Sequence, residues 1–209
     1  MKKPAEIELN LGEKELGEIS RKFLRGNRQF YEAYDIVERN SKGDIWLIGG
    51  YLYGNLAKEI YGEMTVFTPG ITDIDFLLEG QIRDFYMPLG WELKFTDYGN
   101  PYFVRGNERI DLNNLLTFSS ILMRKLSPTL VHFLTGTPLN IQSIAYDCKT
   151  GEVIARKAGI DAINHRVLRI NNHETARDEA RRRGISIEEM LKTKADELGF
   201  RYSICREIK

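Results

Sequence analysis

Two aspartates one residue apart lie inside an otherwise apolar run at residues 70–80, GITDIDFLLEG. A short apolar run of this length predicts a buried β-strand. Side chains alternate across a strand, so Asp73 and Asp75 point to the same face and repel each other. Burying two like charges side by side is costly unless a positive charge lies between them. The pair therefore predicts a strand whose acidic face holds a cation, most simply a metal ion.

The composition is that of an ordinary soluble domain. The chain has 209 residues, 42% hydrophobic and 29% charged, which allows one sizeable core with or without a small appendage. Lys and Arg together number 30, as do Asp and Glu, so the whole chain has no bias toward polyanions. We find no signal peptide and no apolar stretch of the roughly 20 residues that a membrane span needs. Cys148 and Cys205 give no disulfide framework and no zinc motif, so we expect a cytoplasmic protein without a membrane partner.

Helical periodicity marks both ends of the chain. Apolar residues at three- and four-residue spacings predict one or two helices over residues 13–40, with an interruption at Gly26 and Asn27. The tail from Asn171 is polar, with a helix over residues 186–199. A glycine stop, a proline stop or a hydroxyl residue followed by proline marks the other predicted helices. These are residues 51–62, 81–90, 127–134, 137–144 and 159–170.

Strand patterns fill the middle of the chain. Residues 44–50, DIWLIGG, form a short apolar strand that stops at a glycine pair, and residues 63–70 form a loop. Three strand-like runs between residues 91 and 116, separated by the turns YGNP and GN, suit an antiparallel meander. A tight hairpin is expected around Lys149 to Gly151. The order predicts an α+β fold, with helices packed on a mixed, mainly antiparallel sheet.

Three features of this fold could meet at one site. Gly49 and Gly50 lie where a strand turns into a helix, and glycines there let the backbone approach a phosphate beside free N–H groups. Asp73 and Asp75 occupy the next strand, and Asp111 lies in a later strand-like run. Three carboxylates on adjacent strands can hold two divalent cations, and Mg²⁺ suits oxygen ligands completed by substrate phosphates. Each feature alone has a simpler explanation as a turn, a solvated strand end or a polar edge, so the prediction depends on their order.

These motifs resemble a known superfamily. WLIGG followed by a helix, then TDIDFLL and a later strand acid, resembles the polymerase-β-like nucleotidyltransferases. Residues 138–170, PLNIQSIAYDCKTGEVIARKAGIDAINHRVLRI, are similar to a head-domain segment of CCA-adding tRNA nucleotidyltransferases and bacterial poly(A) polymerases. The resemblance implies a nucleotidyltransferase domain at residues 44–170. Residues 1–43 are then an N-terminal helical extension and residues 171–209 a C-terminal helical tail, without the helical domains that grip tRNA in complete enzymes.

The resemblance also implies roles for individual residues. Asp73 and Asp75 would bind two Mg²⁺ ions, one of them carried by the incoming nucleoside triphosphate. Asp111 would share the other ion and orient or deprotonate the acceptor hydroxyl. Gly49 and Gly50 would cradle the β- and γ-phosphates. The acceptor hydroxyl would attack the α-phosphate and release pyrophosphate.

The sequence departs from the resembled pattern at three places. About twenty residues separate Gly50 from Asp73, which is longer than the family usually has. The helix after the glycine pair lacks the Arg-Asp of the CCA-adding group, and Lys58 is the nearest cation, either as a substitute or as a solvated lysine. Residues 133–140, FLTGTPLN, lack the group's arginines and aspartate. These positions contact the triphosphate and the acceptor, so the nucleotide, ATP or another, and the acceptor stay open.

Several functions therefore remain as alternatives. RNA or tRNA is the favoured acceptor, because the segment that matches best belongs to RNA-tailing enzymes, and a protein or small-molecule acceptor is the next alternative. A non-catalytic module that binds nucleotide or RNA on the same scaffold is the alternative from another class. The arginine run Arg181–Arg183, with Arg166, Arg169 and Arg177, could contact RNA or form a solvated helix face.

Overall fold

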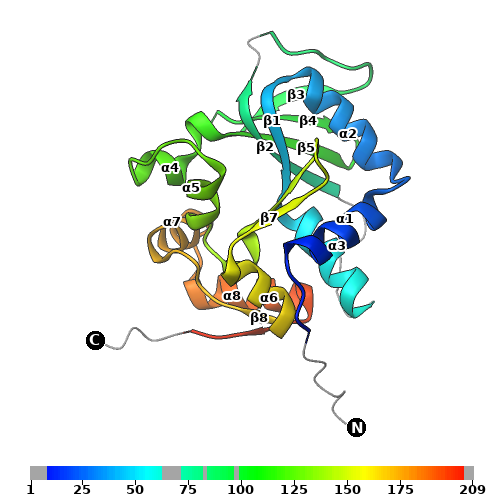
Figure 1. Cartoon of the computed structure of the whole chain (residues 1–209). Helices are drawn as coiled ribbons and strands as arrows, with labels where there is room; N and C mark the ends of the chain where they lie inside the picture. Colours follow the sequence, from blue (N-terminus) through cyan, green and yellow to red (C-terminus); the bar gives the residue numbers. More distant parts are fainter. Residues whose placement is uncertain (1–8, 63–71, 82–83, 97–98, 205–209) are drawn as a thin grey trace.

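The computed structural model describes residues 9–62, 72–81, 84–96 and 99–204. Its centre is a seven-stranded sheet in the order β3-β4-β5-β2-β1-β6-β7 (Figure 1). β2 and β5 run parallel, and the other neighbouring pairs are antiparallel. The prediction of an α+β fold with a mixed, mainly antiparallel sheet is confirmed. The strands are β1 Ser41–Ile48, β2 Thr72–Gln81, β3 Glu92–Phe95, β4 Pro101–Arg105, β5 Glu108–Asn114, β6 Ile144–Asp147 and β7 Val153–Ala155.

Three helices cover one face of the sheet. The predicted interruption at Gly26 and Asn27 separates α1, Glu13–Leu24, from α2, Arg28–Arg39. The Asn27 side chain caps α2 by accepting a hydrogen bond from the Phe30 backbone N–H at 3.1 Å. α3, Gly49–Tyr61, begins directly after β1 and ends at Gly62, as its glycine stop predicts. Buried side chains of these helices form the main core with alternate residues of the strands.

The two faces of β2 carry different residues. Ile74, Phe76 and Leu78 are buried in the main core beneath α1, α2 and α3. Leu77 lies on the opposite face, in a smaller apolar cluster beneath α4, Ser119–Met123, and α5, Leu130–Thr135. Figure 1 shows these two short helices on the side of the sheet away from α1 and α2. Because residues two apart share a face, the acidic pair of β2 lies on this second, less covered face.

The second half of the chain contributes both to the core and to one edge of the sheet. Its elements are η1 Leu115–Thr117, η2 Asn140–Gln142, α6 Lys157–His165, β8 Val167–Leu168, α7 His173–Arg183, α8 Ile187–Leu198 and β9 Arg201–Tyr202. The predicted hairpin at Lys149–Gly151 connects β6 and β7, and the predicted C-terminal helix is α8. Apolar residues of α8, including Leu191 and Leu198, belong to the main core. None of the described helices combines the length and the apolar character needed to cross a membrane.

Two of the predicted helices are wrong. The described part of residues 81–90 contains no helix, because the Asn40 side chain holds the backbone of Tyr86 extended. Asn40 accepts from the Tyr86 N–H at 2.7 Å and donates to the Tyr86 carbonyl at 3.0 Å. Residues 137–144 form only the three-residue η2, because the Thr137 hydroxyl donates to the Leu134 carbonyl instead of capping a helix.

Two other helices exist with different bounds. Thr129, not Ser127, caps α5, since its hydroxyl accepts from the His132 N–H at 3.2 Å. The helix predicted at residues 159–170 ends at His165, because Arg166 adopts a left-handed conformation and the next two residues pair as β8. The predicted loop at residues 63–70 lies outside the described residues.

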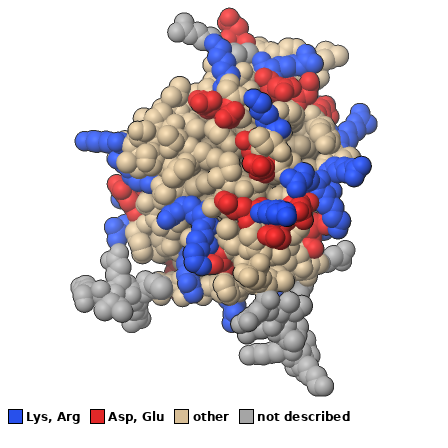
Figure 2. All heavy atoms as spheres, in the orientation of Figure 1, with Lys and Arg blue, Asp and Glu red and all other residues tan. Residues whose placement is uncertain are grey.

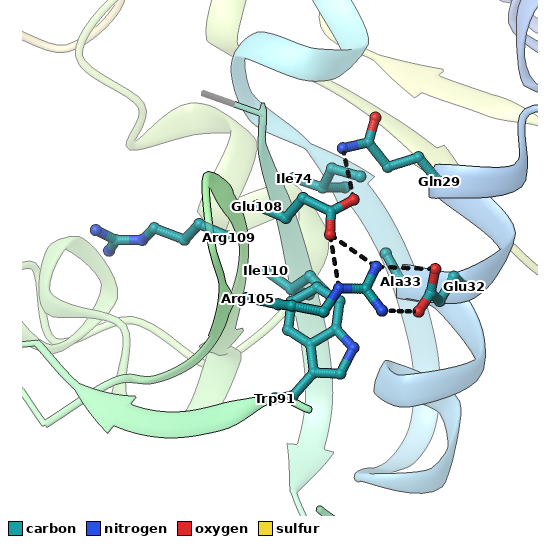
Figure 3. Close-up of a pocket in the computed structure, with 9 residues that line it drawn as sticks. All are labelled: Gln29, Glu32, Ala33, Ile74, Trp91, Arg105, Glu108, Arg109 and Ile110. Carbon is teal, nitrogen blue, oxygen red and sulfur yellow. Dashed lines mark hydrogen bonds and ion pairs between the residues drawn. The ribbon is translucent and has the colours of Figure 1, made fainter. Parts of the chain in front are cut away.

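A charged cluster fastens α2 to the strand meander. Figure 3 shows Arg105 of β4 between Glu32 of α2 and Glu108 of β5, with Trp91 below it. Its guanidinium donates to Glu32 Oε2 at 3.1 Å and Glu108 Oε2 at 2.8 Å, and it lies 4.4 Å from the centre of the Trp91 ring. The hydrogen bond from Arg105 is the main reason why the pKa of Glu32 lies below its usual range. This cluster lies on the helix-covered face of the sheet and holds the meander in register with α2.

We expect Arg105→Gln to lower the free energy of unfolding by about 1–2 kcal/mol, because it removes two ion pairs and a cation–π contact and leaves Glu32 and Glu108 facing each other. Urea denaturation measures the loss. Lys157→Gln is the control, because the Lys157–Asp161 pair is an exposed pair within one helix and is expected to contribute less than about 0.5 kcal/mol. Equal losses in the two variants would contradict a structural role for the Arg105 cluster.

Candidate active site

Gly49 lies at the point where the chain leaves β1 and enters α3. Its φ of +75° is in the left-handed region, which favours glycine. A Cβ atom added at Gly49 would lie 2.1 Å from Oδ2 of Asp75 and 2.9 Å from the Asp75 Cβ. The backbone of the junction therefore passes directly against the Asp75 carboxylate, at a helix end whose first N–H groups have no partner within the helix. The glycine is required for this close approach.

The three predicted acids lie on neighbouring strands of the same sheet. Asp73 and Asp75 share one face of β2, and the parallel register places Asp111 of β5 opposite Asp75. The same register places Arg109 opposite Asp73. Asp75 is half-buried and Asp73 is exposed. The sequence pattern therefore predicted the shared face correctly, and the pairing of β2 with β5 brings the third acid next to the first two.

The two β2 carboxylates lie in an environment short of positive charge. Burial raises the pKa of Asp75 to about 7, and repulsion from Asp111 and Asp73 adds to this effect. Burial also raises the pKa of Asp73, which the Arg109 guanidinium partly opposes. Carboxylates that resist ionisation in this way gain stability from a bound cation. Oxygen ligands of this kind fit Mg²⁺.

Asp111 is neutralised by a neighbour on its own strand. Arg109 donates from Nε to Asp111 Oδ2 and from Nη2 to Asp111 Oδ1, both at 2.7 Å. Its guanidinium also lies 4.1 Å from the centre of the Tyr102 ring. Figure 3 shows Arg109 pointing away from the Arg105 cluster, toward the opposite side of the sheet. In the described part of the chain, no three Asp, Glu, His or Cys side chains converge as they stand into a metal site. Among the described residues, Asp73 and Asp75 have no bidentate partner of the kind that Arg109 gives Asp111.

A single cleft of about 950 Å³ brings most of the predicted residues together. Gly49, Gly50, Lys58, Asp73 and Asp75 all line it. Among the described residues, Asp111 is not part of its lining. Residues of α7 and α8 also line the cleft. Aromatic and hydroxyl side chains in and around α4 and α5, such as Phe118, Ser120 and Phe133, complete its lining. A space of this size accommodates a ligand as large as a nucleotide.

The fold is shared with solved structures of known enzymes. No protein-family model and no curated protein sequence matches the chain. A CCA-adding enzyme in complex with CTP matches with a TM-score of 0.53 and 19% identity, over 92% of this chain and 43% of that one. The chain has a fold that also occurs within a CCA-adding enzyme. An apo CCA-adding enzyme matches with a TM-score of 0.51 and 20% identity, over 87% of this chain and 40% of that one. An apo tRNA-processing enzyme matches with a TM-score of 0.51 and 15% identity, over 94% and 46%.

This chain spans less than half of the length of those enzymes. At these identities the likeness concerns the fold alone. The fold shared with CCA-adding enzymes agrees with the resemblance inferred from the motifs WLIGG and TDIDFLL. It places the glycine junction, the acidic strand and the third acid in the order that the sequence predicted.

Three residues in or near the cleft were missed by sequence analysis. Tyr53 and Lys194 line the cleft, from α3 and α8 respectively. Arg109 lies beside it through its pairing with Asp111. The alternation Arg109-x-Asp111 could have indicated a shared strand face. Lys194 gave no signal, because nothing local in the sequence brings α8 to the first strands of the sheet.

The arginine run of the tail is largely neutralised by its own helix. Arg182 pairs with Asp178 at 3.1 Å and also with Glu179, and Arg183 pairs with Glu179 at 2.6 Å. Arg166 donates to the Gly199 carbonyl and lies over the Tyr61 ring. Figure 2 shows basic and acidic side chains interspersed on the face in view. These pairs favour a structural role for Arg166, Arg182 and Arg183 over a contact with an RNA backbone.

The acidic site predicts an unusual pH dependence of stability. A carboxyl group whose folded-state pKa is raised contributes stability below its ordinary value of 3.8, and this is lost as the pH rises through about 7. One pKa unit corresponds to about 1.4 kcal/mol, and water in the cleft offsets part of it. Without divalent cations, we expect Asp75→Asn to equal the wild type in stability at pH 4 and to exceed it by about 2 kcal/mol at pH 8. Urea denaturation at both pH values measures this, and an equal difference at both would contradict it.

Proposed function

We propose that the chain is a magnesium-dependent nucleotidyltransferase that moves a nucleoside monophosphate from a nucleoside triphosphate to a hydroxyl acceptor. The observation that carries this proposal is the shared cleft. Asp73 and Asp75, both short of neutralising charge, line the cleft from one face of β2. Asp75 lies directly against Gly49 at the N-terminal end of α3. The likeness in fold to a CCA-adding enzyme in complex with CTP supports a nucleoside triphosphate as the donor.

The residues of the cleft fit the charges of the reaction. Asp73 and Asp75 would ligate Mg²⁺, which would neutralise charge on the triphosphate and polarise the α-phosphoryl group. Free N–H groups of Gly49 and Gly50 would hold the β- and γ-phosphates. The acceptor oxygen would attack the α-phosphorus, the bond from that phosphorus to the bridging oxygen would break, pyrophosphate would leave, and the hydroxyl proton would pass to solvent water. Asp111 pairs with Arg109 and does not line the cleft among the described residues, so it would orient the acceptor hydroxyl once that ion pair opens. Catalysis would then come mainly from positioning and charge neutralisation.

RNA is our favoured acceptor and the cytoplasm our favoured location. The solved structures that share this fold include enzymes described as CCA-adding and tRNA-processing. The neutralised arginines of α7 argue against a broad RNA-binding face on that helix. The acceptor would therefore be held by its end within the cleft, and a protein hydroxyl or a small alcohol could be held in the same way.

A non-catalytic nucleotide-binding module is the second candidate. The observation that favours it is the ion pair between Arg109 and Asp111, because a third carboxylate that is already neutralised leaves a single pair of acids for cations. Such a module would bind triphosphate without releasing pyrophosphate.

The test is a transfer assay with each of the four α-³²P nucleoside triphosphates and Mg²⁺, in an extract depleted of small nucleotides. RNA, protein and small-molecule fractions are counted for the wild type, Asp73→Asn and Asp75→Asn. The proposal predicts label in one fraction with the wild type and none with either variant. Triphosphate binding by the folded wild type, with no label in any fraction, would instead favour the binding module.

A further inference from the structure

A lysine from the C-terminal part of the chain shares the cleft with the glycine junction. Lys194 of α8 lines the same cleft as Gly49, Gly50 and Asp75. Its ammonium lies 6.0 Å from the centre of the Tyr53 ring. The Tyr53 hydroxyl oxygen would lie 3.8 Å from a Cβ added at Gly50, so Tyr53 connects the glycine pair to Lys194. Lys194 also stabilises the ionised form of Asp75, which places its charge within electrostatic range of the acidic pair.

Lys58, the cation that the sequence suggested, lies farther along α3. Nine residues separate it from Gly49, which corresponds to about 13 Å at the helical rise of 1.5 Å per residue. Lys58 is exposed and lines another part of the cleft. A lysine side chain extends too short a distance to bring its ammonium back to the first turn of α3. Lys58 and the glycine pair are therefore poorly placed to bind the same phosphate.

Lys194 pairs with a carboxylate that is accessible to water. Its side chain is 24% exposed and pairs with Glu197, which is 44% exposed. Burial by itself would lower the pKa of Lys194, but the Tyr53 hydroxyl and the Glu197 carboxylate outweigh it and raise that pKa. Arg183 of α7 also faces Lys194 and is itself paired with Glu179. A charged lysine whose acidic partner is accessible to water can exchange that partner for a phosphate.

We propose that Lys194 binds the terminal phosphates of the nucleoside triphosphate, so that α8 completes a phosphate site built by Gly49 and Gly50. This inference rests on the proposed function and gives the C-terminal helix a direct part in it. The site would take a linear polyphosphate, with N–H groups of α3 on one side and the Lys194 ammonium on the other. It would supply the positive charge that the helix after the glycine pair lacks.

The experiment uses inorganic tripolyphosphate with Mg²⁺ as the probe and the full chain as the protein. Isothermal titration calorimetry gives its affinity for the wild type, Lys194→Gln, Lys194→Arg and Lys58→Gln. Lys192→Gln is the matched control, because Lys192 is an exposed lysine of the same helix. Thermal unfolding without ligand is measured for each variant, to separate a binding defect from a folding defect.

We expect Lys194→Gln to weaken tripolyphosphate binding by about tenfold or more, because a charge-assisted hydrogen bond is lost. Lys194→Arg retains the charge and should restore affinity to within about threefold of the wild type. Lys58→Gln should weaken binding less than Lys194→Gln, and Lys192→Gln should leave it unchanged. The affinity of Lys194→Gln should also fall less steeply with added salt than that of the wild type.

Three results would overturn the inference. If Lys194→Gln binds tripolyphosphate as tightly as the wild type, while Asp75→Asn loses Mg²⁺-dependent binding, the proposed function stands and the role of Lys194 is wrong. The same conclusion follows if Lys194→Arg is as defective as Lys194→Gln although it unfolds at the wild-type temperature. If the folded wild type binds neither tripolyphosphate nor any nucleoside triphosphate, the proposed function fails and this inference fails with it.

Discussion

Replacement of Asp75 by asparagine is expected to lower nucleotide transfer by about a hundred- to a thousandfold and to abolish the dependence of triphosphate binding on Mg²⁺. The amide has almost the same shape as the carboxylate, so the packing against Gly49 is preserved, but its charge and one oxygen ligand are lost. Transfer of α-³²P label gives the rate. Binding of each nucleoside triphosphate, with and without Mg²⁺, gives the metal dependence.

Glu79→Gln is the matched control for this variant. Glu79 lies on β2 four residues beyond Asp75, on the same strand face, and it accepts a hydrogen bond from the Asp44 N–H at 3.1 Å. Its amide can keep that bond, so we expect transfer within about twofold of the wild type. The higher stability expected of Asp75→Asn at pH 8 also separates a catalytic loss from misfolding. Transfer at the wild-type rate by a folded Asp75→Asn protein would contradict the role of the acidic pair.

Gly49→Ala is expected to have the second largest effect, because one methyl group would affect both the fold and the site. The added Cβ overlaps three atoms of the short Asp75 side chain, at 2.1, 2.8 and 2.9 Å, and the φ of +75° is unfavourable for alanine. We expect a loss of about 2–4 kcal/mol in the free energy of unfolding. In the molecules that do fold, displacement of Asp75 should lower transfer about a hundredfold or more.

Two glycine variants separate the causes of this effect. Gly62 has a similar φ of +80° but nothing within 4 Å of an added Cβ, so Gly62→Ala should cost only the backbone strain, about 1–3 kcal/mol, and leave transfer unchanged. Gly50→Ala introduces an ordinary contact with the Tyr53 hydroxyl at 3.8 Å and should be tolerated by the fold. If Gly49→Ala is no more destabilising than Gly62→Ala, the close approach to Asp75 is not significant.

The sequence predicted the features that depend on local periodicity. The alternation in TDIDFLL placed Asp73 and Asp75 on one face, because a strand repeats every two residues. The strand, glycine pair and helix around Gly49 follow from an apolar run that stops at residues able to adopt a positive φ. The meander followed from its turns, and its last strand placed Asp111 in line with β2.

One wrong helix arose from a local bond of the Thr137 hydroxyl, and the other arose where a side chain from a distant part of the chain changed the local preference. Residues 84–90 are extended because Asn40, more than forty positions earlier, binds the backbone of Tyr86. The contribution of Lys194 to the cleft depends on the packing of α8 against the core. The Arg109–Asp111 pair lies within β5, but its position beside Asp73 and Asp75 depends on the exact register of β2 and β5. Such long-range pairings have no signature in a single sequence.

The most direct test is a crystal structure with Mn²⁺ and a non-hydrolysable nucleoside triphosphate, with anomalous scattering used to locate the metal. The account predicts an anomalous peak at coordination distance from carboxylate oxygens of both Asp73 and Asp75, about 2.0–2.2 Å. It also predicts the triphosphate at the N-terminal end of α3, beside Gly49 and Gly50. A triphosphate bound elsewhere, or bound in the cleft with no metal at these two aspartates, would contradict it.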